Sequence, residues 1–111
     1  MKDEIEYDDF AKIDVRIGTV IFAEKIDGTD KLIKCTVDFG EFGERTIVSG
    51  ILEWKQPEEL VGKQLPYIVN LKPRMLKGVE SQGMLLAVSF GEKDFSLLQP
   101  EVDVPPGVTI V

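Results

Sequence analysis

The chain has no histidine and only one cysteine, Cys35, among its 111 residues. Histidine and cysteine supply most zinc ligands, and imidazole is the usual base beside a serine or cysteine nucleophile, so neither kind of site is expected. The densest group of acids lies between Asp3 and Asp9, at a terminus that frays and cannot hold a carboxylate pair or a metal in fixed geometry. We therefore expect no catalysis, no cofactor and no metal.

Long apolar runs are missing as well. No stretch approaches the ~18 consecutive apolar residues that a membrane span requires, and the acidic N-terminus lacks the apolar core of a secretory signal. Cys35 has no second cysteine with which to form a disulfide, which suits a reducing compartment. The sequence predicts a cytoplasmic protein without a membrane partner.

Apolar residues recur at every second position, which is typical of short strands rather than helices. The first expected strand begins at Val15 and is apolar on both faces near its end, which indicates a central position in the sheet. The second, over 31–39, places Cys35 on an apolar face, so Cys35 is predicted to be a buried core thiol. A third strand over 45–49 is expected to form a hairpin with the second.

One short helix is expected over 57–62, because Pro57 suits a first helical turn and Gly62 can end it. Further strands are expected over 64–71, 83–90, 95–98 and 108–111. Curved strands with a helix between the third and fourth indicate an all-β OB-fold, a five-stranded barrel that commonly binds oligonucleotides or oligosaccharides. The expected organisation is an acidic extension over 1–6 and one OB-fold domain over 7–111, including a C-terminal extension.

Four aromatic side chains are interpreted as core residues of this barrel: Phe10, Phe22, Trp54 and Tyr67. For Trp54 a second interpretation stays open, because an exposed indole can also stack on a nucleic-acid base.

The positive charges gather in one part of the chain. The protein has 13 basic and 20 acidic residues and a net charge of −7, yet 60–79 contains four basic residues and no acid. A phosphate is attracted by nearby charges, because screening limits their reach to about 8 Å at physiological salt. Between Asn70 and Met84 the cations are joined by amides, a hydroxyl and glycines, residue types that contact RNA phosphates, ribose and base edges. We interpret this segment as an RNA-binding loop that Pro73 holds extended.

The same segment resembles the tRNA-binding domain family, which occurs at the C-terminus of many methionyl-tRNA synthetases and in free-standing tRNA-binding proteins. The similar stretches are 10–18 (FAKIDVRIG), 47–51 (IVSGI), 57–63 (PEELVGK) and 70–84 (NLKPRMLKGVESQGM). The resemblance implies an OB-fold that binds tRNA mainly by shape and phosphate contacts. It also implies a homodimer, with methionyl-tRNA synthetase as a candidate partner.

Carried over by position, the resemblance implicates nine residues in RNA binding: Arg16, Lys31, Asn70, Lys72, Arg74, Lys77, Ser81, Gln82 and Met84. Of these, Lys72, Arg74 and Lys77 are expected to bind phosphates. Ser81 and Gln82 are interpreted as RNA contacts.

Three of the nine have two open interpretations. Arg16 either faces the RNA or pairs with an acid across the sheet. Asn70 either touches RNA or caps its own turn. Met84 either packs on a base or belongs to the core.

Two other functions stay open. A related family with the same fold is associated with chaperone-like peptide binding in protein export, although its members usually lack the Ile-Val-Ser-Gly form found at 47–50. The chain is also interpreted as a detached, non-catalytic appendage of a synthetase, because it has no nucleotide-binding glycine loop. A dimer interface is expected to use 97–111 together with Ile5, Tyr7 and Phe10.

Overall fold

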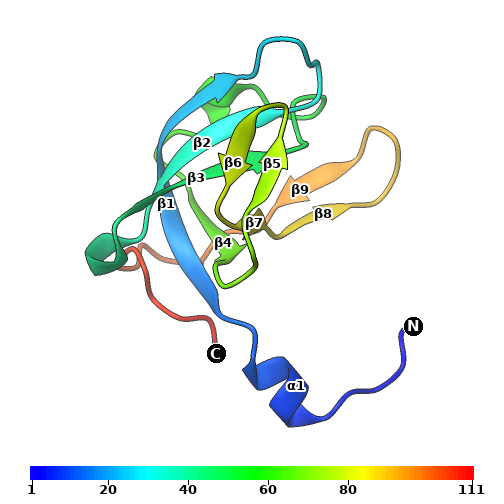
Figure 1. Ribbon diagram of the computed structural model, residues 1–111, viewed down its shortest axis with the longest axis vertical. Helices are drawn as coiled ribbons and strands as arrows, with labels where there is room; N and C mark the ends of the chain where they lie inside the picture. The colour runs from blue at the N-terminus through cyan, green and yellow to red at the C-terminus, as the bar shows by residue number, and fades with distance from the viewer.

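A computed structural model describes residues 1–111, and its centre is a curled antiparallel sheet of five strands in the order β3-β2-β1-β4-β7 (Figure 1). The strands are β1 (Val15–Lys25), β2 (Ile33–Asp38), β3 (Glu44–Ser49), β4 (Gln64–Ile68) and β7 (Met84–Leu85). The expected central position of the first strand is confirmed, because β1 pairs with β2 on one side and β4 on the other. A curled sheet of this kind with a short helix after its third strand is the OB-fold.

The alternation in β2 determines which side chains enter the core. Ile33, Cys35 and Val37 are buried, while Lys34 and Thr36 lie on the other face. Burial raises the pKa of the Cys35 thiol to about 11, so the residue stays a neutral packing group at ordinary pH. This confirms the prediction of a core thiol.

The expected helix after the third strand is a single 3-10 turn, η2 (Pro57–Glu59). The side chain of Gln56 accepts a hydrogen bond from the Glu59 N–H, and the Gln56 N–H in turn donates to Glu59 Oε2 at 2.7 Å. Gly62, at φ 89°, reverses the chain into β4. Another 3-10 turn, η1 (Gly40–Phe42), joins β2 to β3 and completes the expected hairpin.

Two small hairpins are added to the barrel. One consists of β5 (Arg74–Leu76) and β6 (Val79–Ser81), and the other of β8 (Ala87–Ser89) and β9 (Phe95–Leu97). The single strand expected over 83–90 is wrong, because the chain leaves the barrel at Leu86: β7 pairs with β4, whereas β8 pairs with β9. The loop expected to be extended around Pro73 folds instead into the β5–β6 hairpin.

Of the four aromatic core predictions, those for Phe10 and Phe22 are wrong, because both side chains are about half-exposed. Phe10 lies in α1 (Tyr7–Ala11), a helix that was not predicted and that lies apart from the barrel in Figure 1. Tyr67 is buried as predicted, with 2% of its surface exposed. Trp54 is half-buried and packs against the core.

The C-terminal extension returns along the barrel. Gln64 in β4 donates through Nε2 to the Val104 carbonyl at 2.7 Å and accepts from the Val104 N–H at 3.0 Å. Farther on, Thr109 forms an isolated bridge with Arg16 of β1, so the strand expected over 108–111 is reduced to one pair. No helix in the structure has the length and apolar character needed to cross a membrane.

Candidate nucleic-acid interface

Backbone and side-chain hydrogen bonds attach the end of the β5–β6 hairpin to the edge strand β3. The Gln82 N–H donates to the Thr46 carbonyl at 2.8 Å, and the Thr46 N–H donates to Gln82 Oε1 at 3.0 Å. The Val48 N–H donates to Ser81 Oγ at 3.0 Å. These bonds satisfy an edge that would otherwise present unpaired backbone groups, and they close the seam of the barrel.

Ser81 and Gly83 allow this seam to be tight. Ser81 is only 5% exposed, and its hydroxyl donates to the Gly83 carbonyl at 3.2 Å. A Cβ at Gly83 would lie 2.9 Å from Ile47 Cδ1 and 3.2 Å from the Ile68 carbonyl oxygen. A side chain here would therefore push on the buried Ile47 and on β4 where the chain passes from the hairpin into β7.

The tip of the hairpin presents Lys77. Lys77 has φ 49° and Gly78 has φ 79°, so both central residues of this two-residue connection have positive φ. Such turns match the twist of a hairpin and favour glycine, asparagine or aspartate. A lysine here accepts backbone strain and places its ammonium at the most remote point of the hairpin.

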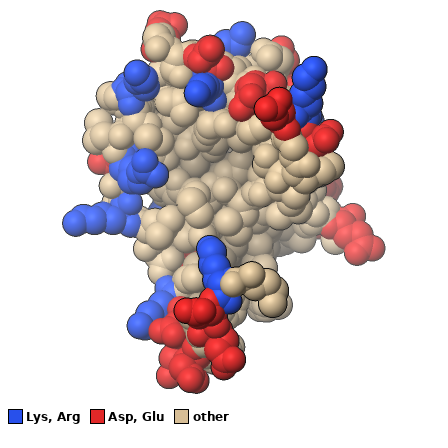
Figure 2. Space-filling model, turned by 90° about the vertical axis from the view of Figure 1, so that its right-hand side faces the viewer, with Lys and Arg blue, Asp and Glu red and all other residues tan.

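The hairpin's cations are free of ion pairs. Lys72, Arg74 and Lys77 are absent from the three salt bridges of the protein, which are Lys12–Asp9, Arg16–Asp14 and Lys34–Glu24. Lys72 and Arg74 are also exposed. In Figure 2 basic side chains stand along the left edge of the face shown, basic and acidic side chains are mixed at the top, and the projecting N-terminal part at the bottom is mainly acidic. The hairpin is thus a local source of positive potential on an acidic protein.

A small cavity of about 120 Å³ brings four of the nine predicted residues together: Lys72, Arg74, Ser81 and Met84. Its other walls are Val48 of β3, Leu71, Leu76 and Gly83. Met84, one of the residues with two open interpretations, is 45% exposed and lies at this cavity rather than in the core.

Arg16 lies elsewhere and is engaged within the protein. Its Nε lies 3.0 Å from Asp14 Oδ1, and its Nη1 donates to the Gly107 carbonyl at 2.9 Å. Its guanidinium carbon lies 4.4 Å from the centre of the Phe42 ring. The paired acid precedes Arg16 in the chain by two residues instead of lying across the sheet, and the arginine joins β1 to the C-terminal extension.

Asn70 and Lys31 are also outside the cavity. Asn70 donates through Nδ2 to the Lys12 carbonyl at 2.6 Å and accepts from the Asp14 N–H at 2.8 Å, so it holds the entry into β1 rather than its own turn. Lys31 is exposed in the loop between β1 and β2, where its N–H donates to Thr29 Oγ1 at 3.1 Å.

Arg45 is a supporting residue that sequence reasoning missed. From the inner face of β3 its Nη1 donates to the carbonyls of Val69 and Gln82, the second at 3.2 Å. Arg45 thereby bonds a residue that precedes the hairpin, Val69, and a residue that follows it, Gln82. The hairpin itself had a weak sequence signal, the Lys77-Gly78 pair, because two-residue turns of this type favour asparagine or aspartate before the glycine.

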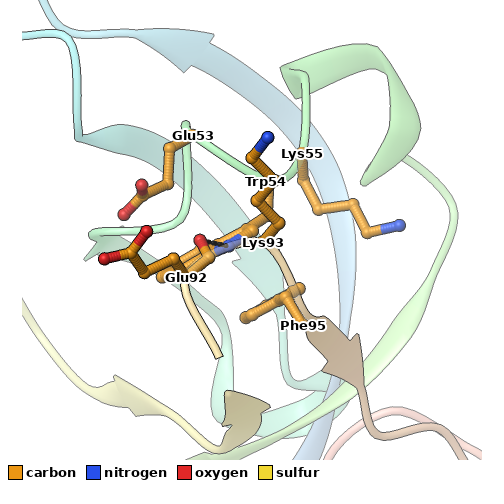
Figure 3. A pocket seen from close by; sticks show the side chains of 6 residues that line it. All are labelled: Glu53, Trp54, Lys55, Glu92, Lys93 and Phe95. Atoms are coloured by element: carbon orange, nitrogen blue, oxygen red, sulfur yellow. Dashed lines mark hydrogen bonds between the residues drawn. The ribbon is translucent and has the colours of Figure 1, made fainter. Parts of the chain in front are cut away.

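The second hairpin is held by aromatic packing. The rings of Trp54 and Phe95 stack with centroids 5.0 Å apart and planes 7° from parallel, and Trp54 Nε1 donates to the Glu92 carbonyl at 3.2 Å (Figure 3). An open hollow beside them is lined by charges of both signs: Glu53, Lys55, Glu92 and Lys93. This mixture gives no net attraction for a phosphate backbone.

Comparison with known proteins gives a consistent result. Residues 15–109 match the family model described as a putative tRNA binding domain. A methionine–tRNA ligase of Flavobacterium johnsoniae is 48% identical over 109 residues, which are 98% of this chain and 15% of that protein. The chain therefore spans about one seventh of the length of this curated relative.

This chain also superposes on two solved structures over the full length of their chains. A MetRS related protein from Pyrococcus horikoshii superposes with a TM-score of 0.92 at 44% identity, covering 99% of this chain and 100% of that one. The chaperone CsaA from Bacillus anthracis superposes with a TM-score of 0.89 at 33% identity, covering 98% and 100%.

Proposed function

Because the chain belongs to the putative tRNA binding domain family, we propose that it is a non-catalytic module that binds tRNA mainly through shape and phosphate contacts. The observation that carries the proposal is the unpaired basic hairpin, with Lys72, Arg74 and Lys77 held rigidly against the barrel. Phosphate contacts position a protein on RNA without reading its sequence, so this arrangement suits recognition of the common tRNA fold.

The nine predicted residues divide into two roles under this proposal. Lys72, Arg74, Lys77 and Lys31 supply phosphate contacts, and Met84 contributes an apolar surface. Arg16, Asn70 and Ser81 support the interface through their bonds inside the protein. Gln82 does both, because its Oε1 accepts from Thr46 while its Nε2 is left to donate to RNA.

The test is equilibrium binding of tRNA over a salt series. A Lys72→Ala, Arg74→Ala, Lys77→Ala variant should lose most binding, and its dependence on salt should become shallower, because fewer counterions are released when fewer phosphates are neutralised. The matched control is Lys2→Ala, Lys55→Ala, Lys93→Ala, which removes the same charge elsewhere. Equal losses in both variants would show that net charge matters and not the hairpin. Failure of the wild type to bind at low salt would overturn the proposal.

We further propose that the module serves a synthetase, as a domain, appendage or subunit. The match to about one seventh of a methionine–tRNA ligase supports this, and the surrounding compartment would be the cytoplasm. Co-purification with methionyl-tRNA synthetase, or a lower KM for tRNA when the chain is added to that enzyme, tests the association. An unchanged KM together with separate elution would contradict it.

We also propose that the protein is a homodimer. Ile5, Tyr7 and Phe10 are exposed on an arm that lies apart from the barrel, and the end of the chain exposes Ile110 and Val111. A second copy would cover these side chains and join two basic hairpins into one longer surface. Light scattering after size exclusion should report a dimer, and Tyr7→Ser with Phe10→Ser should shift it toward monomer. A wild-type monomer at micromolar concentration would overturn the homodimer.

The alternative function is chaperone-like peptide binding, which the structural similarity to a chaperone at 33% identity favours. It would use exposed apolar or edge-strand surface rather than the cations. Binding of an unfolded polypeptide that the hairpin variant retains, with no tRNA binding by the wild type, would favour this function over the first.

A further inference from the structure

The cavity beside the β5–β6 hairpin has the size and lining of a site for a flat ring. Its volume of about 120 Å³ is about four times the ~30 Å³ that one water occupies in the liquid. Its walls include four apolar side chains from three parts of the chain: Val48, Leu71, Leu76 and Met84. Such a space suits an apolar or aromatic group better than an ion.

The buried side-chain polar group of its wall is already used inside the protein. Ser81 Oγ accepts from the Val48 N–H and donates to the Gly83 carbonyl. The hydroxyl proton is therefore committed. A ring entering the cavity would be held mainly by contact with the apolar side chains.

The mouth of the cavity carries two positive charges that have no partner in the protein. Lys72 and Arg74 line the opening and belong to none of the ion pairs. Glu80 is the nearest acid in the sequence, but it pairs across the hairpin with Met75, and so lies on the face opposite Arg74. An apolar ring attached to a negatively charged chain is the ligand that complements this site.

We propose that the cavity takes one unpaired nucleobase of the bound RNA, with Lys72 and Arg74 holding the phosphates on either side of that nucleotide. The proposal rests on the function proposed above and adds a preference within it. Sequence-tolerant protein contacts to unstacked bases are a general mode of single-strand recognition. Because the one buried hydroxyl of the wall is already committed and the other walls are mainly apolar, the site favours unpaired RNA without selecting the base.

The test compares three alanine variants at exposed positions. Met84→Ala and Leu71→Ala remove apolar walls of the cavity, where the native side chains are 45% and 48% exposed. Met75→Ala is the matched control, because Met75 is 64% exposed on the same hairpin and does not line the cavity. Thermal unfolding of each variant confirms that the fold is retained.

Each variant is titrated with tRNA, with short oligo(A) and oligo(U), and with a blunt RNA duplex of equal charge. The variants remove apolar surface that would pack on the base, so we expect both cavity variants to bind tRNA and the single strands about tenfold more weakly than the control. Their salt dependence should match that of the wild type, because the phosphate contacts remain. Oligo(A) and oligo(U) should bind alike, and the duplex should be insensitive to the cavity variants.

The possible outcomes separate the two proposals. If the wild type binds tRNA in a salt-dependent way and the cavity variants equal the control, the base site is wrong and the phosphate-binding hairpin stands. Equal loss of duplex and single-strand binding in the cavity variants would also overturn the base site. If the wild type binds no RNA, both proposals fail.

Discussion

The two small hairpins of this protein are alike in length and differ in charge and attachment. β5–β6 carries Lys72, Arg74 and Lys77 in and beside its strands and is attached to β3 through hydrogen bonds of Ser81 and Gln82. β8–β9 carries charges of both signs at its turn and is attached through the stacked rings of Trp54 and Phe95.

This difference explains how an acidic protein can offer a surface to RNA. Unpaired cations act over about a Debye length, so three of them on a rigid support matter more to a phosphate than the net charge of −7. Attachment by hydrogen bonds leaves the cations exposed and the apolar cavity open. Beside the stacked rings of the β8–β9 hairpin, the open hollow is lined by charges of both signs.

The largest expected effect is on RNA binding when the charge of the first hairpin is reversed. Arg74→Glu with Lys77→Glu should weaken tRNA binding about 100-fold, which corresponds to about 2.7 kcal/mol, because two attractive contacts become repulsive. The same change at Lys55 and Lys93, beside the second hairpin, should leave affinity within a factor of two. Fluorescence anisotropy with labelled tRNA at one fixed salt concentration measures both. Equal weakening would remove the functional difference between the hairpins.

The next largest effect is a loss in the free energy of unfolding when the attachment of the second hairpin is removed. Trp54→Ala should lower the free energy of unfolding by about 2 kcal/mol, because it removes a half-buried ring from Phe95. Trp54→Phe keeps a ring there and loses only the bond from Nε1, so about 1 kcal/mol is expected. Urea unfolding measures the loss, and tRNA binding by the folded variants should be unchanged. Weaker tRNA binding in Trp54→Phe would instead assign RNA contact to the indole.

A serine-to-alanine pair compares a serine that attaches the first hairpin with a serine of the second hairpin that takes no part in attaching it. Ser81→Ala should cost about 1–2 kcal/mol, because it leaves the Val48 N–H without its acceptor in a buried place. Ser96→Ala removes an exposed hydroxyl that bonds only the neighbouring Leu97 carbonyl, and its cost should stay within about 0.5 kcal/mol. Chemical denaturation of both variants is the measurement. Similar small costs would mean that the Ser81 bond does not hold the hairpin.

The smallest effect concerns the strained tip of the first hairpin. Lys77→Asn should raise the free energy of unfolding by a few tenths of a kcal/mol, because asparagine tolerates the positive φ of this turn better than lysine. The same change should lower the salt slope of tRNA binding by about 1 through loss of one phosphate contact. A stabilised variant with an unchanged slope would remove Lys77 from the interface.

Much of the barrel could be predicted from the sequence because its signals are local. The alternation through Ile33, Cys35 and Val37 repeats at the period of a strand, and Pro57 and Gly62 mark the turn between the third and fourth strands. The errors have a common cause. Phe10 and Phe22 are hydrophobic enough for a core, but burial depends on which other segments cover them, and about half of each side chain stays exposed.

The sequence by itself determined the strand periodicity, the local gathering of positive charge and the absence of histidine-based chemistry, since each depends only on residue types and their spacing. The tertiary structure alone decided what Ser81, Gln82 and Asn70 do. Apart from the Gly83 carbonyl beside Ser81, their hydrogen-bond partners are 33 to 58 positions away in the chain, and a polar side chain carries no sign of a partner that folding brings from such a distance. The cavity has the same origin, because its apolar walls come from strands and loops that become neighbours only when the barrel closes.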